Sequence, residues 1–321
     1  MDQNLEKNLL LTIPGIVGIK STDEAKSNHL DGLEIMQPMT EHYVRNINRK
    51  NYHWLCHSEF SWFLAEAVPI AYGLFKNNLL NFMVSFEGSE PYLPFLPQDK
   101  LLISKGTGLN TLGGSPPYLG SKIYSKEYKS INAYWEAPPL KNFYKDKLKF
   151  NFKKPLMIIN NKLTEEWSHG PINCFYSKDL ELLLKALNDK YAIGYIRSKG
   201  NEKGFCNDGS KVLEEDDFST IKNNCSEYII IQDLMEQTGV TFNIAQCLMH
   251  AESNIHISSS GGNAIIASYF GGKNIIIGRG EKFKQRPVWH KDSWLKNLSG
   301  SEIFHADLEI NNWEQEIKSL L

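Results

Sequence analysis

Short apolar runs recur through the second half of the chain and are separated by polar or amphipathic segments. Five of these runs have the length and density of buried strands, at residues 155–160, 191–197, 228–234, 254–258 and 274–278. Segments with the length of helices lie between most of them. Strands that alternate with helices form βαβ units, which build a parallel sheet covered on both faces. The pattern therefore predicts a doubly wound α/β domain.

Three segments between these runs have the spacing of helices. Leucines recur on one helical face of residues 177–190, where Ser177 is placed to cap the N-terminus. Residues 243–253 follow the same pattern, with Asn243 as the expected cap. The apolar segment 264–270 completes the set, between the last two strands.

The first half of the chain has a less regular pattern. Residues 59–80 have apolar positions at helical spacing, and Pro69 in the middle predicts a kink or a break. The runs 81–87 and 100–104 are typical of strands. Residues 104–122 are rich in glycine and proline, which predicts a long loop, and loops of that length are more often functional than idle.

A chain of 321 residues is long for a single core, so two domains are expected. The boundary is predicted in the lysine-rich stretch from Leu140 to Pro155, which has no steady periodicity and ends in proline. This divides the chain into domains 1–150 and 151–321, with the last helix free to pack back on the first domain.

The composition of the chain limits the kinds of protein that it can be. Hydrophobic residues make up 41% and charged residues 22%, as in globular proteins, and the net charge of −2 gives no basic field for nucleic acid. The five cysteines are scattered without a CxxC spacing, which indicates neither a zinc site nor a disulfide framework and fits a reducing compartment. Neither a signal peptide nor a membrane-spanning run of about 18 apolar residues is recognisable, so a cytoplasmic location is expected.

The stretch "SSSGGN" at 258–263 is the first candidate site, because it lies at the carboxyl end of one predicted strand and opens the next helix. Gly261 and Gly262 remove side chains where the first helical N–H groups are unpaired, so a phosphate can approach the backbone. Ser259, Ser260 and Asn263 add hydrogen-bond donors. The alternative is a tight turn with a capping serine. The stretch matches neither a P-loop nor the GxGxxG pattern.

A second group of polar residues follows the first strand of the predicted sheet. Asn161, Lys162, Glu165, Glu166 and His169 crowd into a short segment, where a lysine can meet a phosphate and a carboxylate or histidine can take a proton. The alternative is a solvated polar loop.

Arg197 and Asp233 end two further predicted strands. An arginine at a strand's carboxyl end suits a phosphate, and the region of Asp233 suits a base or a ribose. For each residue alone, an ordinary polar position at the start of a loop is the alternative.

In the first half, His53, His57 and Glu59 precede or begin the predicted helix among several aromatic residues. A histidine in an apolar setting has a pKa that can be tuned near neutrality, which suits a general base. The alternatives are a packed histidine without chemistry and a metal ligand, although no third ligand stands at a telling spacing.

The pair of segments "IINNKLTEEW…GPIN" and "LMHAESNIHISSSGGNAIIASYFGG" resembles a set of uncharacterised glycosyltransferases of the GT-B fold from bacteria and large viruses. The likeness covers about residues 155–280. The segment "HWLCHSEFSWFLAEAVPIAYGL" resembles, more faintly, transferases that add xylose or N-acetylglucosamine with inversion. The resemblance implies two Rossmann-like domains that face a central cleft, with the nucleotide-sugar donor on the second domain and the glycan acceptor on the first.

The resemblance also implies roles for the candidate residues. The donor diphosphate would lie at Gly261 and Gly262, with Lys162 or Arg197 offsetting the charge of the leaving group. His57 or Glu59 would be the base for the acceptor hydroxyl, and the transition state would resemble an oxocarbenium ion.

Enzymes of this fold generally need no bound metal and no further cofactor. The absence of an Asp-x-Asp motif agrees, since "EEDD" at 214–217 is a poor substitute. Two alternatives remain open: a non-catalytic nucleotide- or sugar-binding module, and a sugar-nucleotide epimerase of the same architecture.

Overall fold

The computed structural model describes residues 52–55, 60–78, 80–104, 135–165, 171–205, 211–280 and 294–321. The chain forms two compact units, Met1–Ala137 and Pro138–Leu321. Both contain parallel strands connected through helices, so the predicted α/β class is confirmed.

The division between the units lies earlier than residue 150. Helix α8 (Leu140–Tyr144) belongs to the second unit, where it packs against α12 (Phe242–Ala251). The Lys141 ammonium donates to the Ser253 carbonyl at 2.8 Å. The lysine-rich stretch is therefore anchored at its start rather than being a free linker, and the functional roles of the two units stay predictions.

The first unit has a three-stranded parallel sheet in the order β1 (Tyr52–Leu55), β2 (Leu80–Phe86), β3 (Leu101–Ser104). The predicted helix between the first two strands consists of α4 (Phe60–Trp62), a π-helical turn and α5 (Val68–Lys76). Short 3-10 helices at residues 90–92 and 98–100 precede β3.

The expected break at Pro69 is present as a change of helix type. The π-helix Phe63–Ala67 ends just before α5, and Pro69 stands in the first turn of α5. Proline fits there because the first helical N–H groups have no intrahelical acceptor.

The second unit is built on a six-stranded parallel sheet in the order β11-β10-β9-β4-β6-β8. Its strands are β4 (Leu156–Asn160), β6 (Ala192–Ile196), β8 (Tyr228–Ile230), β9 (Ile255–Ser259), β10 (Lys273–Gly278) and β11 (Glu302–Asp307). The chain starts in the middle at β4, moves outward through β6 and β8, and returns to place β9 on the other side of β4. This is the 3-2-1-4-5-6 order of doubly wound folds, with its topological switch point between β4 and β9.

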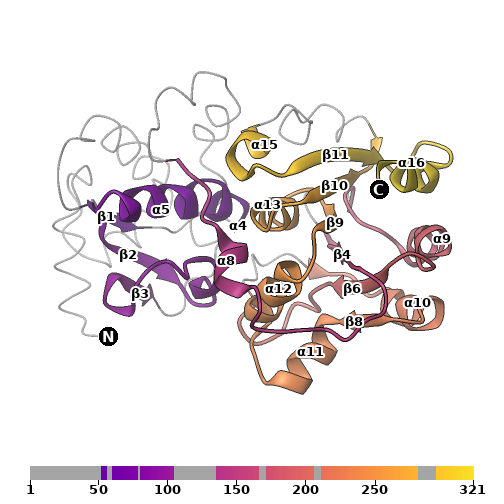
Figure 1. Ribbon diagram of the computed structural model, residues 1–321, viewed down its shortest axis with the longest axis horizontal. Coiled ribbons are helices and arrows are strands. Elements are labelled where there is room, and N and C mark those ends of the chain that lie inside the picture. The colour runs from indigo at the N-terminus through magenta and orange to yellow at the C-terminus, as the bar shows by residue number, and fades with distance from the viewer. Residues whose placement is uncertain are drawn as a thin grey trace. The chain divides into compact units, whose positions relative to one another are not determined.

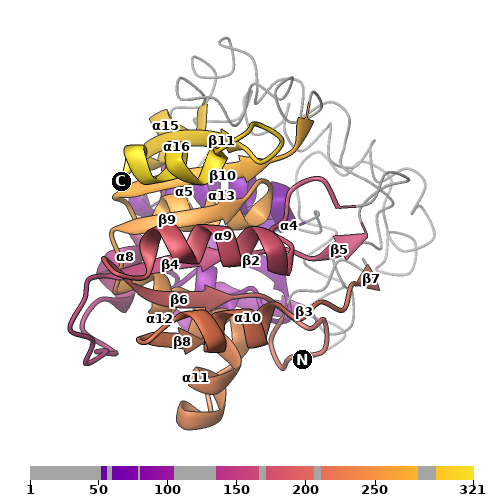
Figure 2. The ribbon, with the colours of Figure 1, turned by 90° about the vertical axis from the view of Figure 1, so that its right-hand side faces the viewer.

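Helices cover both faces of this sheet. They are α9 (Ser177–Leu187), α10 (Asp217–Asn224), α11 (Ile231–Thr238), α12, α13 (Gly262–Tyr269), α15 (Trp294–Ser299) and α16 (Trp313–Leu320). In Figure 1, α9, α10 and α16 lie on one side of the strands and α12 and α13 lie on the other. Figure 2 looks onto the α9 side. Strands β5 (Thr164–Glu165) and β7 (Lys211–Val212) form a separate, two-stranded antiparallel sheet.

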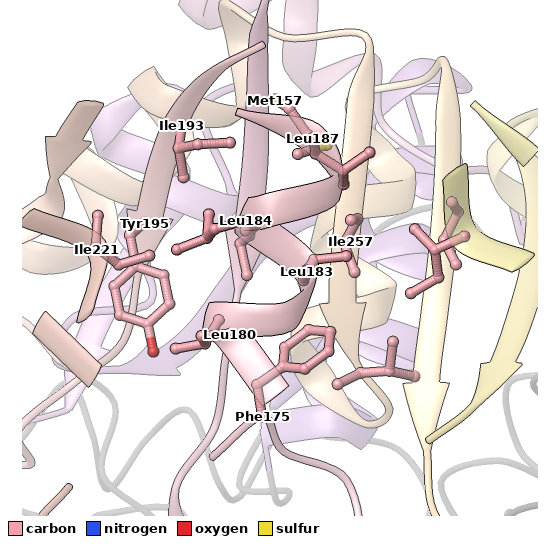
Figure 3. Close-up of a cluster of buried hydrophobic side chains, with 14 of the residues drawn as sticks. Met157, Phe175, Leu180, Leu183, Leu184, Leu187, Ile193, Tyr195, Ile221 and Ile257 are labelled. Atoms are coloured by element: carbon pink, nitrogen blue, oxygen red, sulfur yellow. The ribbon is translucent and has the colours of Figure 1, made fainter. Parts of the chain in front are cut away.

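Helix α9 shows why the hydrophobic pattern predicted this unit well. Leu180, Leu183, Leu184 and Leu187 are each at most 1% exposed and pack with strand residues such as Ile193 (Figure 3). Burying each leucine contributes about 1.5–3 kcal/mol to folding. The predicted helical face therefore fixes α9 on the sheet.

Both predicted helix caps differ from the structure. Tyr176 is the N-cap of α9, and the Asp179 carboxylate accepts the Tyr176 N–H at 2.9 Å. The Ser177 hydroxyl is buried and has no hydrogen-bond partner in the described part of the chain. Asn243 lies inside α12, whose N-cap is Thr241. In both cases the helix starts one or more residues earlier than expected.

The predicted strand 228–234 is also too long. Strand β8 ends at Ile230 and α11 begins at Ile231, so Asp233 lies in the first turn of a helix. Ile231 and Leu234 are both buried at helical spacing. A continuous apolar run concealed this change of period.

Candidate functional site

The switch point brings together the carboxyl ends of β4 and β9 and the N-terminus of α13. Strand β4 ends in Asn160 and is followed by Asn161, and β9 ends in Ser259. The helix begins at Gly262, as predicted. Ligands of open parallel sheets bind outside the carboxyl ends of the strands at such a point.

The turn between β9 and α13 leaves three consecutive backbone donors available. Gly261 has φ +116° and ψ −150°, a conformation that essentially only glycine adopts. Within the described residues, the N–H groups of Gly261, Gly262 and Asn263 donate to no acceptor. A Cβ placed on Gly261 would meet nothing within 4 Å. The turn thus offers unpaired N–H groups and an open approach at the positive end of a helix.

The two serines differ in their surroundings. The Ser259 hydroxyl is buried and donates to Asn161 Oδ1 at 3.5 Å. Ser260 is 3% exposed, and its hydroxyl forms no hydrogen bond with any residue that the structure describes. Ser260 is therefore the serine that can serve a ligand at this turn.

Asn161 holds the site together. Its Oδ1 accepts the N–H groups of Phe175 and Lys162, both at 2.9 Å. Its Nδ2 donates to the Phe175 carbonyl and the Tyr195 hydroxyl, also at 2.9 Å. Asn263 Nδ2 donates to the Asn161 carbonyl at 3.2 Å, which ties α13 to β4. Asn161 therefore positions backbone around the site, and its side-chain amide is already fully used.

Asn173 is a second residue that connects the segments around the site, and the sequence did not predict this role. Its Nδ2 donates to the Ser260 carbonyl at 2.5 Å, and the side chain is buried. The segment before α9 is thus bound to the ends of both β4 and β9. The polar residues that do this are separated widely in sequence, and no motif marks them.

Asn160 points to the face of the sheet opposite to Asn161, and the sequence did not predict its role. Its Nδ2 lies 3.2 Å from His250 Nε2, and His250 Nδ1 lies 3.3 Å from His256 Nδ1. All three residues are at most 1% exposed. Burial holds the pKa of His250 well below its ordinary value, with His256 adding to the effect. Burial, together with the charge of Lys141, lowers the pKa of His256 to about 3. Both imidazoles are neutral near pH 7.

The predicted cations have different environments. Lys162 follows the turn residue Asn161 and is partly buried. Arg197 pairs with Asp217: its Nε contacts Asp217 Oδ2, and its Nη2 lies 2.7 Å from Asp217 Oδ1. Both side chains are at most 5% exposed. The charge of Arg197 is therefore already balanced, and a phosphate cannot use these donors without breaking the pair.

The remaining predicted residues do not join the switch point in the described part of the chain. Glu165 is exposed on β5, where its carboxylate lies 3.4 Å from the Lys211 ammonium. Asp233 is partly buried in α11. The other four predicted residues lie outside the described residues: His57, Glu59, Glu166 and His169.

Among the described residues, no group of three or more His, Cys, Asp or Glu side chains is arranged to hold a metal ion. The helices described there include none long and apolar enough to cross a membrane.

Comparisons with known proteins add little to this geometry. No family model matches the chain, and no curated protein matches it. Among solved structures, the chain is similar to Escherichia coli ADP-heptose LPS heptosyltransferase II at 9% identity and a TM-score of 0.33. The match covers 75% of this chain and 66% of that one. A likeness of this size carries no conclusion about activity.

Proposed function

We propose that the protein is a glycosyltransferase that moves a sugar from a nucleotide-sugar donor to a glycan acceptor, with inversion and without a metal ion. One observation carries the proposal. Three consecutive N–H groups, from Gly261 to Asn263, are unpaired within the described residues at the switch point of a 3-2-1-4-5-6 sheet. This arrangement suits the diphosphate of a nucleotide.

The chemistry at this turn favours a dianion over a neutral ligand. A helix N-terminus carries roughly half a positive charge, and consecutive N–H groups form a concave anion site. The Ser260 hydroxyl adds a donor on the same turn. Lys162, two residues after β4, is the cation that we assign to the leaving diphosphate, as the sequence resemblance implies. The guanidinium of Arg197 is engaged by Asp217.

Transfer requires that this turn bind the transition state more tightly than the ground state. As the glycosidic bond breaks, negative charge builds on the diphosphate oxygens, and fixed N–H donors stabilise that charge without reorganising. The same donors take the electrostatic part that a divalent cation has in metal-dependent transferases. No further cofactor enters the proposal.

The acceptor side of the proposal rests on the sequence resemblance. His57 or Glu59 in the first unit is the proposed base for the acceptor hydroxyl, and Glu165, Glu166 and His169 are the candidates of second rank. A general base contributes about 10²–10⁴-fold to such a reaction.

Thermal denaturation with a panel of nucleotide sugars and nucleoside diphosphates tests the proposal. A ligand at 100 times its Kd stabilises the folded state by about 2.7 kcal/mol. The control is Gly239→Ala, which changes a positive-φ glycine at the end of α11. We expect one nucleotide class to stabilise the wild type and the control but not Gly261→Ala. No stabilisation by any member of the panel would contradict the proposal.

Catalysis is tested separately with the donor that binds best. Release of nucleoside diphosphate that depends on a glycan acceptor supports transfer, and release in water alone shows only hydrolysis of the donor. Binding without any release would favour the non-catalytic binding module.

A further inference from the structure

Asn160 and Ser260 lie on one face of the sheet at the switch point. Side chains alternate along a strand, and Leu156 and Ile158 of β4 pack in the same cluster as residues of α12, so Asn160 points to that face as well. On β9, His256 and Ser258 alternate toward the same face, with Ser260 next in the series. Asn160 therefore stands beside the turn that opens α13, because it is paired with Ser258 across the two strands.

The side chain of Asn160 has one end occupied and one end available. Its Nδ2 lies 3.2 Å from His250 Nε2. Its Oδ1 forms no hydrogen bond with any described residue, and the residue as a whole is 1% exposed. An amide oxygen without a partner is an acceptor that a hydroxyl group of a ligand can use.

The position of the Asn160 amide sets the direction of the hydrogen bonds behind it. Its Nδ2 lies 3.2 Å from His250 Nε2, so that ring nitrogen is the acceptor. Each neutral imidazole has one donor and one acceptor nitrogen, so His250 carries its proton on Nδ1 and donates to His256 Nδ1 at 3.3 Å. The proton of His256 is then on Nε2, a buried nitrogen that has no hydrogen-bond partner in the described part of the chain.

We infer that Asn160 is a specificity-determining residue whose Oδ1, oriented by His250 and His256, accepts a hydrogen bond from a hydroxyl group of the nucleotide-sugar donor. The inference rests on the proposed function, since it places this hydroxyl next to the diphosphate at Gly261 and Gly262. An amide oxygen repels a phosphate oxygen but binds a hydroxyl. The ribose and the transferred sugar both carry hydroxyls beside the diphosphate, and the two sources share this chemistry.

The protonation pattern of the histidines tests the orientation without any ligand. Nitrogen NMR of ¹⁵N-histidine-labelled wild-type protein at pH 7, assigned with His250→Gln and His256→Gln, reports which ring nitrogen carries the proton. We expect His250 to be protonated on Nδ1 and His256 on Nε2. Protonation of His250 on Nε2 would mean that Asn160 presents its NH₂ group to the site, and would overturn the inference.

Binding of three probes tests recognition of a hydroxyl. Pyrophosphate has no hydroxyl of this kind, a nucleoside diphosphate has those of ribose, and the nucleotide sugar adds those of the sugar. Asn160→Leu removes the acceptor, and Ser258→Ala on the same face of β9 is the control for a disturbed core. We expect Asn160→Leu to bind pyrophosphate as the wild type does. A hydrogen bond to a neutral hydroxyl corresponds to about tenfold in Kd.

The pattern of losses identifies the source of the hydroxyl. About tenfold weaker binding of both nucleotide probes assigns it to ribose, and a loss confined to the nucleotide sugar assigns it to the sugar. Equal changes for all three probes, or no change for any, would overturn the inference while leaving the proposed function in place. If the wild type binds none of the probes, the proposed function fails and the inference fails with it. Should Asn160→Leu not fold, the histidine protonation pattern in the wild type still decides.

Discussion

Replacing His256 by leucine should make the protein less sensitive to acid. In the folded protein, burial lowers the pKa of His256 to about 3, against an ordinary value of 6.5. Between these two pH values, His256 is therefore protonated in the unfolded chain and neutral in the folded protein. Stability from this group is fully present above pH 6.5 and is lost as the pH falls towards 3.

The size of the effect follows from the slope of about 1.4 kcal/mol per pH unit for each proton. Between pH 7.5 and pH 4.5, His256 alone should lower the free energy of unfolding by about 3 kcal/mol. His250, whose pKa is also lowered by burial, adds to the wild-type slope and remains in the variant.

Urea denaturation of wild type and His256→Leu from pH 7.5 to pH 4.5 measures this difference. Carboxylates titrate in both proteins and cancel, so only the difference in slope counts. His305→Gln is the matched control, because His305 is exposed on β11. We expect the variant to lose about 3 kcal/mol less than the wild type over the acid range, and the control to follow the wild type. Parallel curves for wild type and His256→Leu would refute the reasoning.

Four further predictions test the site and the network beside it. Gly261→Ala should cost about 1–3 kcal/mol through backbone strain and should weaken pyrophosphate binding in calorimetry, whereas Gly239→Ala should leave binding intact; equal affinities for both variants would reduce the turn to a structural role. Arg197→Met should lose about 3–5 kcal/mol in urea denaturation because it leaves Asp217 buried without its partner, and a loss below 1 kcal/mol would contradict the internal ion pair. His57→Ala should reduce the rate of transfer by about 10²–10⁴-fold with donor affinity unchanged, and a near-native rate would contradict its role as the base. The activity of the wild type should survive EDTA, and activity restored only by Mn²⁺ would contradict a metal-independent reaction.

The hydrophobic pattern was sufficient for the architecture of the second unit. Buried strands and the leucine face of α9 each follow from a period that the sequence displays directly. The Ser-Ser-Gly-Gly turn could also be placed, because glycine at a strand-to-helix junction marks backbone that other residues adopt only with strain.

The sequence pattern could not predict which polar side chains bind one another in the folded protein. Asn161 seemed a ligand for the donor, yet its amide binds Phe175 and Tyr195, which are remote in sequence. Arg197 seemed a free cation because its partner Asp217 lies twenty residues away on another element. Asn160 was not predicted as a site residue, because its polar neighbour His250 lies far along the chain on α12.

Helix ends were the other source of error. Asp233 was assigned to the end of a strand because Ile229, Ile230 and Ile231 form one apolar run, although the chain changes from strand to helix within it. Strand and helix cannot be separated by period over so few residues.

The amide resonances of Gly261 and Gly262 provide the most direct test of the central claim that this turn binds a nucleotide diphosphate. The measurement is a titration of ¹⁵N-glycine-labelled protein with a nucleoside diphosphate, with Gly261→Ala to assign the signals. The account predicts that both resonances shift and saturate together, while the resonance of Gly239 stays in place. Saturable binding that leaves Gly261 and Gly262 unmoved would contradict it.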